Sequence, residues 1–450
     1  MPARPPLPPG PFLVVGLARS GVAVARALHA RGETVVGCDS GAVPAERLEL
    51  GTALGVAVHA PSQGTELLNG IGSVIKSPGV PKEAAVIAAA RAAGIVVIGE
   101  LEFGWRLAPN DTIAVTGSNG KTTTAELIGH VHREAGIPVA VVGNVGTALS
   151  SLAGGTLDPA TVVVCEASSF QLEDTERFAP DAAVLLNLAE DHLDRHGSFD
   201  AYRDAKLRIF EHQAADAVAV LPDDLDVAVG GAARQVRFGA GPKAQLADRG
   251  GTLHWGHERL TGVDELALRG HHNRLNAMAA AAVCLARGLD PAAVRAGLAS
   301  FGGVKHRLEE VASIDGVLYV NDSKATNVAS ALVGIASFDG GVHVILGGSA
   351  KGSDYRPLAG PVAERCAGAY LIGETAPQIA QALAGTGVTL TRSGDLEHAL
   401  AAATAAARPG QVVLLSPACA SFDQYRSYEE RGDRFRALVQ GADPERRSHA

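Results

Sequence analysis

Short runs of β-branched and other apolar residues alternate with Ala- and Leu-rich amphipathic segments along almost the whole chain. This alternation restricts the possible folds more than any other feature, because strands that alternate with helices form parallel sheets covered by helices. The expected strands fall into three groups: Phe12–Ala18, Glu33–Asp39 and Ser73–Gly79; then Thr112–Gly117, Val139–Asn144, Thr161–Ser168 and Asp181–Leu188; then Val342–Gly348, Gly368–Gly373 and Gln411–Ala418. The sequence therefore predicts an α/β protein of three Rossmann-like domains.

The length supports several domains, because 450 residues are too many for one hydrophobic core. A turn at Leu107–Asp111 and a glycine-containing stretch at Phe301–Lys305 separate the three groups of strands. We therefore expect an N-terminal domain at residues 1–107, a central domain at 108–303 and a C-terminal domain at 304–450. The central domain is expected to be of the P-loop mononucleotide-binding type, with a mostly parallel sheet.

Charge and composition exclude several functional classes. The formal net charge is −9 with acidic and basic residues interspersed, which argues against a nucleic-acid-binding protein. The five cysteines are scattered without a CxxC pair, which favours a reducing compartment. The N-terminal MPARPPLPPG lacks the apolar core of a signal peptide, and the apolar run Ala277–Ala286 is too short to span a membrane. We expect a cytoplasmic monomer that binds neither nucleic acid nor membrane.

The glycine-rich turn VTGSNGKTTT follows an apolar strand and opens a predicted helix at Thr122–Glu134. Consecutive backbone N–H groups in such a turn can approach phosphate oxygens, and the helix N-terminus adds positive potential. We expect Lys121 to neutralise the β- and γ-phosphates and the Thr122 hydroxyl to bind Mg²⁺. Two residues rather than four separate Gly117 from Gly120, which argues against an ordinary P-loop NTPase.

Three further side chains suit a site for metal and phosphate, although each also has an ordinary structural interpretation. Glu166 ends a predicted strand, where α/β sheets place their sites, and could either bind Mg²⁺ or cap a helix. His192 follows the next strand in a polar loop, where a lone histidine is more often hydrogen-bonded than a ligand. Lys206 lies in the predicted helix Ala201–Phe210, where a lysine is ordinarily solvated. Only their combination with the glycine-rich turn favours a shared site.

Four motifs in this order and spacing, GSNGKTTT, EASSFQLE, EDHLDRH and AYRDAKLRIF, resemble the central domain of the Mur ligase family. Two more, NDSKATN and SPACASFDQYRSYEERGDRF, resemble the D-glutamate-adding branch of that family, and the resemblance extends from about Phe12 to about Leu438. It implies an ATP-dependent amide ligase that adds D-glutamate to UDP-N-acetylmuramoyl-L-alanine. Such an enzyme makes a peptidoglycan precursor and so serves cell-wall biogenesis, cell shape and cell division.

The resemblance also implies which residues bind ATP and metal. The implied ATP contacts are Gly117, Ser118, Asn119, Gly120, Lys121, Thr122, Thr123, Asn273, Asn276, Arg307 and Asp322. The implied ligands of two Mg²⁺ ions, which Mn²⁺ could replace, are Thr122, Glu166, His192 and Lys206 as a CO₂-derived carbamate. Arginine, the commoner cation in this chain, could not form that carbamate because its pKa lies above ~12. Lys121, His192 and Lys206 are the implied catalytic residues.

The other two substrates are implied to contact the outer domains. The implied UDP-substrate contacts are Arg19, Ser20, Asp39, Ser40, Ser77, Gly79 and Asn144. The implied glutamate contacts are Lys324, Thr326, Lys351, Ser421 and Tyr428. The remaining lysines, Lys76, Lys82, Lys243 and Lys305, have no such role and are expected at the surface.

The expected mechanism begins when the alanyl carboxylate attacks the γ-phosphate of ATP and forms an acyl phosphate, which the glutamate amine then attacks. Three alternatives stay open. One is a ligase related to folylpolyglutamate synthases, which have the same short phosphate loop. Another is an NAD(P)-dependent nucleotide-sugar dehydrogenase that uses the GLARSG turn, although Ala18 stands where a dinucleotide fingerprint has its second glycine. The third is a non-catalytic binding protein that retains the fold.

Overall fold

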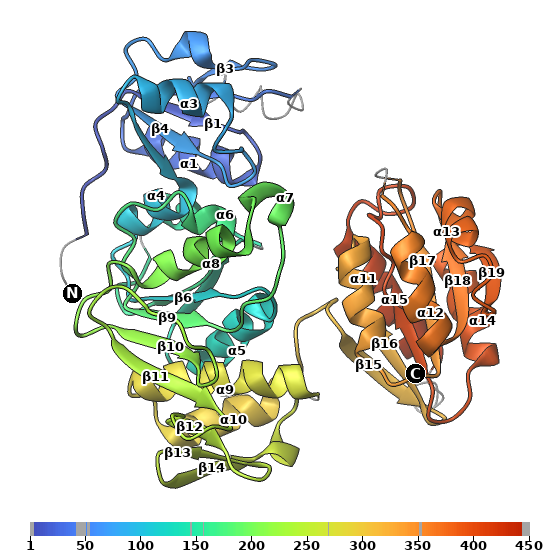
Figure 1. The fold of residues 1–450 in the computed structure, drawn as a ribbon. Helices are drawn as coiled ribbons and strands as arrows, with labels where there is room; N and C mark the ends of the chain where they lie inside the picture. Colours follow the sequence, from blue (N-terminus) through green and yellow to red (C-terminus); the bar gives the residue numbers. More distant parts are fainter. Residues whose placement is uncertain are drawn as a thin grey trace. The chain divides into compact units, whose positions relative to one another are not determined.

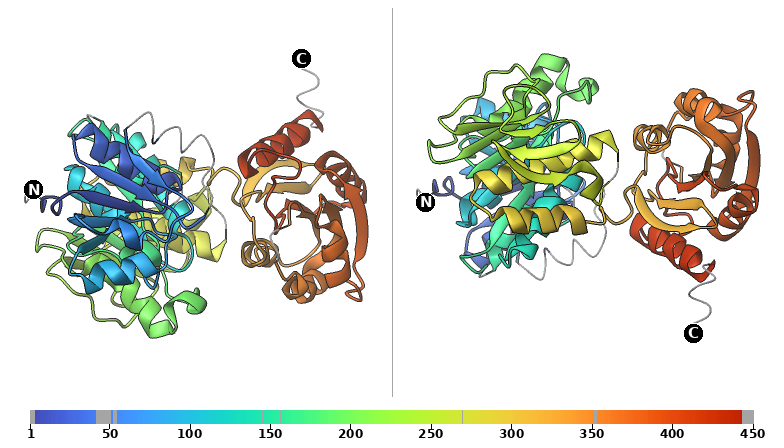
Figure 2. Two further views of the ribbon diagram at one scale, coloured as in Figure 1. Left: turned by 90° about the horizontal axis from the view of Figure 1, so that it is seen from above. Right: turned by 90° about the horizontal axis from the view of Figure 1, so that it is seen from below.

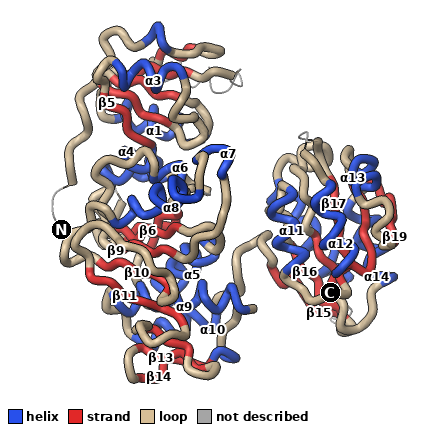
Figure 3. Tube along the Cα trace, viewed as in Figure 1, coloured by secondary structure: helices blue, strands red, loops and turns tan. Residues whose placement is uncertain are grey.

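The computed structural model describes residues 4–41, 51, 55–144, 146–155, 157–268, 270–350 and 353–442. The chain divides into two compact units, Met1–Phe301 and Gly302–Ala450. The first unit contains two sheets and the second contains one (Figures 1 and 3). Three mostly parallel α/β sheets confirm the predicted fold class, whereas the domain limits at 107/108 and 303/304 stay predictions.

The N-terminal sheet is entirely parallel, with the strand order β3-β2-β1-β4-β5. Its strands are β1 (Phe12–Val15), β2 (Val35–Cys38), β3 (Ala57–His59), β4 (Ser73–Lys76) and β5 (Val96–Gly99). The helix α1 (Arg19–Ala30) packs on one face and α3 (Ala85–Ala92) on the other, and a 3-10 turn, η1 (Thr65–Leu67), precedes β4. The order reverses between β1 and β4, which is where open α/β sheets bind ligands.

The central sheet has the order β14-β13-β12-β11-β10-β9-β6-β8-β7, and its neighbouring strands are parallel except that β13 runs antiparallel to both β12 and β14. Its strands are β6 (Thr112–Thr116), β7 (Val139–Gly143), β8 (Val162–Glu166), β9 (Ala182–Leu185), β10 (Val218–Pro222), β11 (Arg234–Gly239), β12 (Leu246–Asp248), β13 (Thr252–Trp255) and β14 (Glu258–Gly262). The sequence analysis anticipated only β6 to β9. The later strands were missed because most of them are short or partly exposed and lack a continuous apolar run.

Helices cover both faces of the central sheet. Alternate residues of β6 point to opposite faces, and Ala114 belongs to the core that also contains Leu172 and Phe210. The helices and 3-10 turns of this region are α5 (Lys121–Glu134), η2 (Leu149–Gly154), α6 (Ser169–Leu172), α7 (Leu193–His196), α8 (Phe199–Leu207), η3 (Arg208–Phe210), η4 (Val263–Glu265), α9 (His271–Ala286) and α10 (Pro291–Ser300). Helix α9 is buried from Asn276 to Leu285, so the apolar run Ala277–Ala286 lies in a buried helix of the central region.

The helix α4 (Glu100–Leu107) packs against both sheets of the first unit. Phe103 belongs to the core of the N-terminal sheet, whereas Leu101 and Trp105 belong to the core of the central sheet. One helix that buries apolar side chains in two cores joins those cores, and this explains why the first 301 residues form one compact unit.

The second unit is built on a sheet of order β15-β16-β20-β17-β18-β19, in which only β15 runs antiparallel to its neighbour. Its strands are β15 (Glu309–Ile314), β16 (Val317–Asn321), β17 (Val342–Gly347), β18 (Cys366–Ile372), β19 (Thr389–Gly394) and β20 (Val412–Leu415). The helices α11 (Val328–Ala336), α12 (Ala359–Arg365) and α13 (Ala376–Ala382), with η5 (Arg356–Leu358), pack on one face (Figure 2). The helices α14 (Leu396–Ala406) and α15 (Tyr428–Ala442) pack on the other.

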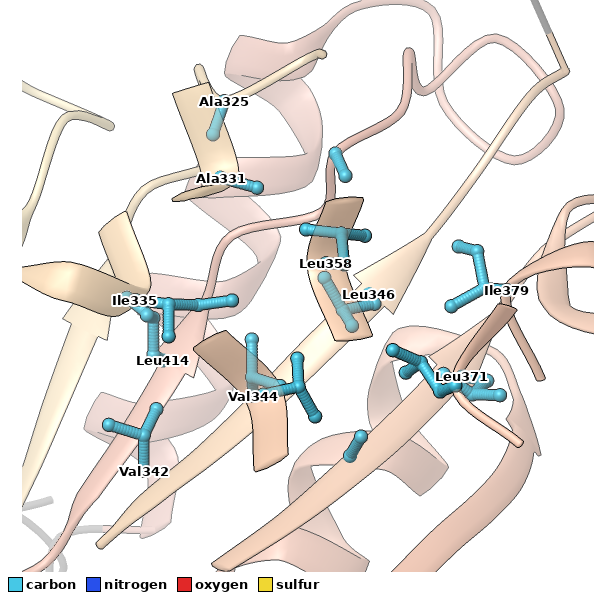
Figure 4. Close-up of a cluster of buried hydrophobic side chains, with 14 of the residues drawn as sticks. Ala325, Ala331, Ile335, Val342, Val344, Leu346, Leu358, Leu371, Ile379 and Leu414 are labelled. Atoms are coloured by element: carbon cyan, nitrogen blue, oxygen red, sulfur yellow. The ribbon is translucent and has the colours of Figure 1, made fainter. Parts of the chain in front are cut away.

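The strand β17 shows how both faces of this sheet are buried. Val342, Val344 and Leu346 point into the core that Figure 4 shows, where Ile335 of α11 also packs. Ile345, between them in sequence, belongs to the core on the opposite face. A strand buried on both sides has a continuous apolar run, which is why the sequence predicted it. In the described parts of the chain, no helix combines the length and the apolar character that crossing a membrane requires.

Candidate active site

The phosphate-loop residues lie between the end of β6 and the start of α5. Gly120, which precedes α5, has φ +85°, a left-handed conformation that favours glycine. A Cβ atom at Gly120 would lie 2.2 Å from Oδ1 of Asn276, so α9 approaches the loop too closely for a side chain. A Cβ at Gly117 would lie 2.9 Å from the Cβ of Leu186. The structure therefore brings Asn276, a predicted ATP contact, against the loop.

The segment after β9 lies against the same loop. The backbone N–H of Asn119 donates to Oδ1 of Asn187 (2.9 Å), and Nδ2 of Asn187 donates to the backbone O of Asn119 (3.1 Å). The hydroxyls of Ser118 and Tyr202 are 2.8 Å apart, and Ser118 Oγ also accepts from the backbone N–H of Ala189 (2.9 Å). The sequence analysis missed Asn187, although a polar residue directly after a buried strand end is the signal that could have identified it.

Glu166, at the end of β8, is buried and in contact with the loop. The Thr122 hydroxyl donates to Oε2 of Glu166 (2.7 Å), and Nδ2 of Asn144 donates to Oε1 (3.1 Å). Thr122 and Glu166, both predicted metal ligands, are thus neighbours, and Asn144, predicted to contact the UDP substrate, joins them. Among the described residues, no three His, Cys, Asp or Glu side chains gather closely enough to form a metal site. The oxygen donors of Thr122 and Glu166 suit Mg²⁺, which usually takes one or two carboxylates and completes its shell with phosphates and water.

Two lysines donate to the backbone of the phosphate loop. Lys121 Nζ donates to the carbonyls of Gly117 and Ser118, both at 2.9 Å. Lys206 Nζ donates to the carbonyl of Gly117 at 2.7 Å, and Lys206 is only 2% exposed. Burial and, to a smaller extent, the charge of Lys121 lower the pKa of Lys206 to about 7, against the opposing charges of Asp191 and Glu166. Lys206 is therefore not the solvated helical lysine that its sequence context alone suggested.

His192 occupies a more open position. It precedes α7 with a left-handed backbone of φ +52°, and its side chain is 49% exposed. Its ring centroid lies 4.7 Å from that of Phe170, which is in α6. Its neighbour Asp191 is close enough to Lys206 to affect the charge on that amine. The role of His192 as a metal ligand stays a prediction.

The turn after β1 forms the predicted nucleotide site of the N-terminal sheet. Gly16 has φ +86°, and a Cβ at Gly21 would lie 1.9 Å from the backbone O of Gly16. Oδ2 of Asp39 accepts a hydrogen bond from the backbone N–H of Leu17 (2.8 Å), and Ser77 Oγ donates to the carbonyl of Gly16 (2.6 Å). Asp39 follows β2 and Ser77 follows β4, so the turn is held from the two strands that flank β1.

The other predicted contacts of the UDP substrate surround this turn. Arg19, Ser40 and Gly79 are exposed, and Ser20 is half-buried at the start of α1. Gly79 belongs to the loop that leaves β4. These residues lie at the carboxyl ends of β1, β2 and β4, next to the reversal of strand order.

The prediction that Lys76 lies at the surface is wrong. Lys76 is 0% exposed, its Nζ is 2.6 Å from Oδ2 of Asp174, and it donates to the carbonyl of Val80 at 2.6 Å. Because Asp174 follows α6 of the central region, the pair is buried where two distant parts of the sequence meet, which local sequence does not show. The surface prediction is confirmed for Lys82, Lys243 and Lys305.

In the second unit, Asp322 follows β16 and is buried beside other predicted nucleotide contacts. Its Oδ2 accepts a hydrogen bond from the hydroxyl of Ser416 (2.8 Å) and its Oδ1 accepts one from the backbone N–H of Leu308 (3.3 Å). Burial raises the pKa of Asp322 to about 7, and the nearby charges of Arg307 and Lys324 oppose this shift. The structure thus gathers Arg307, Asp322 and Lys324 at one end of this sheet.

The predicted glutamate contacts of this unit include one unused donor. The hydroxyl of Ser421 is buried and has no hydrogen-bond partner in the described parts of the chain. Thr326 and Tyr428 are half-buried, the backbone N–H of Thr326 donates to the carbonyl of Lys324 (2.8 Å), and Tyr428 begins α15. Lys351 lies outside the described residues. A buried hydroxyl without a partner is costly unless a ligand uses it, which suits a binding role for Ser421.

Arg431 of α15, which the sequence analysis missed, joins the two loops that carry these residues. It is 0% exposed, and its guanidinium donates to Oγ of Ser323 (3.0 Å), the carbonyl of Ser323 (2.9 Å), the carbonyl of Cys419 (3.1 Å) and the carbonyl of Ala420 (3.3 Å). Ser323 precedes Lys324 and Ala420 precedes Ser421, so one buried side chain sets the spacing of both loops. Burial lowers the pKa of Arg431 to about 10, which leaves it charged at neutral pH.

Replacing Arg431 with methionine is expected to destabilise the second unit by about 3 kcal/mol, because several buried acceptors lose their donor. The measurement is the midpoint of chemical denaturation. The matched control is Arg426→Met, since the Arg426 side chain is 93% exposed and paired only with Glu430 among the ion pairs of the described chain. Equal midpoints for the two variants would contradict this role of Arg431.

Comparison with known protein families matches all three regions of the chain. Residues 11–99 match the N-terminal domain of MurD-like Mur ligases, residues 115–284 match the Mur ligase middle domain, and residues 306–419 match the Mur ligase glutamate ligase domain. The chain belongs to the Mur ligase family. This membership argues against the alternative of a nucleotide-sugar dehydrogenase.

Curated members of the family align with nearly the whole chain. A protein of Acidobacterium capsulatum named UDP-N-acetylmuramoylalanine--D-glutamate ligase is 42% identical over 443 residues, which are 95% of each chain. A protein of Solibacter usitatus with the same name is 41% identical over 444 residues, 96% of this chain and 98% of the relative. The predicted family resemblance is thereby confirmed.

Solved structures of other family members share the fold. The UDP-N-acetylmuramate-alanine ligase MurC of Thermotoga maritima has a TM-score of 0.58 at 21% identity, covering 96% of this chain and 99% of its own. The MurF ligase of the same organism, solved in complex with ADP, has a TM-score of 0.55 at 18% identity, covering 91% and 95%. At these identities the likeness concerns the fold alone.

Proposed function

We propose that this chain is an ATP-dependent ligase that joins D-glutamate to UDP-N-acetylmuramoyl-L-alanine, as the names of its relatives state for those proteins. The observation that carries the proposal is the phosphate loop, where Lys121 and Lys206 meet the backbone and the Thr122 hydroxyl meets Glu166. That arrangement offers amides and cations to a triphosphate beside an acidic oxygen donor. The reaction belongs to peptidoglycan precursor synthesis, and we place the chain in the cytoplasm as a monomer.

Mg²⁺ fits the donors at this loop. Thr122, Glu166, His192 and Lys206 as a carbamate are the residues that would hold it, at two positions that Mn²⁺ could also occupy. Bound there, the ion would offset the negative charge of the phosphates and of the substrate carboxylate. Glu166 and Thr122 already share a hydrogen bond of 2.7 Å, so their oxygens are held together in advance.

The chain's own residues would act on the triphosphate as follows. The alanyl carboxylate attacks the γ-phosphorus, the bond to the β–γ bridging oxygen breaks, and ADP leaves. The loop amides from Gly117 to Thr123 and the ammonium of Lys121 stabilise the charge on the transferring phosphoryl group. The glutamate amine then attacks the acyl carbon and loses a proton. The bond between the acyl carbon and the phosphate oxygen breaks, and phosphate leaves. The half-exposed side chain of His192, next to Asp191, could also accept the proton that the glutamate amine loses.

Glutamate recognition is proposed for the second unit. The acidic substrate needs cations and hydroxyl donors. Ser421 supplies a buried hydroxyl with no partner in the described chain, and Lys324 and Thr326 follow Asp322 on the adjacent loop. Lys351 and Tyr428 complete the proposed set, and Asn273, Asn276, Arg307 and Asp322 are proposed to contact the adenosine and phosphates of ATP.

We also propose that CO₂ carbamylates Lys206. Its amine is buried beside the phosphate loop, 2.7 Å from the carbonyl of Gly117, with Glu166 nearby. Addition of CO₂ to the neutral amine and loss of a proton would replace a cation by an anionic pair of oxygens. Such oxygens suit Mg²⁺ better than an ammonium group does.

The direct test supplies UDP-N-acetylmuramoyl-L-alanine, ATP, Mg²⁺ and either enantiomer of glutamate, and measures phosphate release together with the amide product. We expect phosphate release to require all components. We also expect it to be at least about a hundredfold faster with D- than with L-glutamate, because a site shaped for one enantiomer leaves some of its charged groups unpaired when the other enantiomer binds. Activity with a folate and none with the UDP-sugar would instead support the folylpolyglutamate-type alternative. Binding of the UDP-sugar without turnover would support the non-catalytic alternative.

A further inference from the structure

Arg195, in α7, contacts a loop that is distant in sequence. Its Nη2 atom donates to the backbone carbonyls of Pro78 (3.2 Å) and Val80 (3.1 Å) and forms an ion pair with Oε1 of Glu173 (3.0 Å). The two carbonyls belong to the loop that leaves β4, where Ser77 and Gly79 are predicted contacts of the UDP substrate and would meet its diphosphate. A side chain of the central region thus holds the backbone of a loop of the N-terminal sheet.

The same guanidinium also contacts the aromatic ring that supports His192. The Cζ atom of Arg195 lies 4.2 Å from the ring centroid of Phe170, and that centroid is 4.7 Å from the ring of His192. The ring of His196 also stacks on the ring of Phe170, with centroids 5.4 Å apart and an interplanar angle of 14°. A non-glycine residue with φ +52°, as at His192, persists only where its surroundings hold it. Phe170 therefore lies in contact with both Arg195 and His192.

A buried ion pair fixes the far side of the same loop. Nζ of Lys76 donates to the carbonyl of Val80 at 2.6 Å and lies 2.6 Å from Oδ2 of Asp174. The Val80 carbonyl thus accepts from two cations, Lys76 of its own sheet and Arg195 of the central region. Because Lys76 is fixed by burial, Arg195 is the contact that can transmit a shift of this loop to α7.

We propose that Arg195 is a positioning residue that couples the loop Ser77–Val80, which meets the substrate diphosphate, to His192 at the metal–nucleotide site. The inference rests on the proposed function and assigns to Arg195 the role of positioning residues at that site. Binding of the UDP-sugar orders the loop, the guanidinium keeps its two carbonyl contacts, and Phe170 holds His192 in the left-handed conformation. Such coupling is reciprocal, so bound Mg²⁺-nucleotide tightens the binding of the UDP-sugar by the same factor as the reverse.

The test is calorimetric and needs no turnover. The dissociation constant of UDP-N-acetylmuramoyl-L-alanine is measured for the full chain with and without Mg²⁺ and a non-hydrolysable ATP analogue. In the wild type we expect the nucleotide to lower the dissociation constant of the UDP-sugar about fivefold or more, the lower end of usual coupling between sites. Arg195→Gln should reduce this factor to below about twofold. It should also weaken the binding of the UDP-sugar in the absence of nucleotide, because both loop carbonyls lose the Arg195 donor.

Two further variants separate positioning from general stability. Phe170→Leu leaves the contacts of Arg195 with the loop in place, so the UDP-sugar should bind as in the wild type without nucleotide, while the coupling is lost. Arg195→Lys retains a charge for Glu173 and a donor for the loop carbonyls but lacks the planar guanidinium that covers the ring of Phe170, so partial coupling is expected. Arg203→Gln is the matched control, since Arg203 pairs with Asp200 and Asp204 on the exposed side of α8 and should retain full coupling.

Full coupling in folded Arg195→Gln, or in both Arg195→Lys and Phe170→Leu, would overturn the inference. So would a wild-type chain that binds the UDP-sugar equally well with and without the Mg²⁺-nucleotide. Both results would leave the proposed function standing. A wild-type chain that binds no UDP-sugar under any of these conditions would overturn the proposed function, and this inference with it.

Discussion

Replacing Lys121 with alanine is expected to slow phosphate release by about a thousandfold, while the fold is retained. Lys121 directly follows the glycine-rich turn, and its Nζ donates to the carbonyls of Gly117 and Ser118 in that turn. Removing one preorganised group that stabilises charge in the transition state costs about a hundred- to a thousandfold in rate, and a full positive charge belongs at the upper end. The measurement is the steady-state rate of phosphate release with all substrates saturating.

The control for this variant is Lys243→Ala, which removes an exposed lysine of the same unit and should leave the rate unchanged. Thermal unfolding of both variants is measured as well, so that a loss of rate can be distinguished from a loss of the fold. A Lys121→Ala chain that releases phosphate at the wild-type rate would remove the loop from the mechanism and leave a non-catalytic role for the fold.

Replacing Lys206 with alanine is expected to lower activity by about a hundredfold, and added short carboxylates such as acetate or formate should restore part of it. The carbamate would supply oxygen ligands to Mg²⁺, and the loss of ligands or their supports commonly costs 10- to 100-fold in metal affinity or activity, roughly. Truncation of this buried side chain leaves space in which a small carboxylate can place its oxygens. The measurement is the rate of phosphate release against carboxylate concentration, at saturating Mg²⁺.

Two comparisons make the rescue specific. Lys206→Arg keeps a positive charge but cannot be carbamylated, so it should be as inactive as the alanine variant without being rescued. Lys121→Ala should gain nothing from the same carboxylates, because it lacks a cation rather than an anion. Full activity of Lys206→Ala without any added carboxylate would rule the carbamate out.

Much of the fold was predictable from local sequence, because strands buried on both faces are continuous apolar runs. The predicted strand Val342–Gly348 corresponds to β17 at Val342–Gly347, and the predicted helix Thr122–Glu134 corresponds to α5 at Lys121–Glu134. The strand β10 (Val218–Pro222) is a buried apolar run that was missed although its sequence carries the signal, whereas β11 to β14 were missed because they are short or partly exposed. Their stability comes from pairing with neighbours rather than from their own pattern.

The sequence predicted some parts of the candidate site better than others. The turn from Gly117 to Gly120 was predicted between a strand and a helix from consecutive residues, and the structure has it there between β6 and α5, while its role in binding ATP stays a prediction. The contact between Thr122 and Glu166 was foreseen only as a shared role, because the sequence shows that both follow strands but not that β6 and β8 are neighbours. Asn187 was missed because the predicted strand Asp181–Leu188 included it, whereas β9 ends at Leu185 and leaves Asn187 in the loop beyond.

The sequence alone determined the three-sheet α/β architecture, the phosphate loop and the family, because each is written in residues that are consecutive or regularly spaced. Only the tertiary structure decided the positions of Lys76, Arg195 and Arg431. Each of these cations is stabilised in a buried or half-buried place by acceptors that follow other strands or lie in distant loops. The physical reason is desolvation: a charge leaves water only where partners compensate it, and the chain supplies those partners only after it has folded.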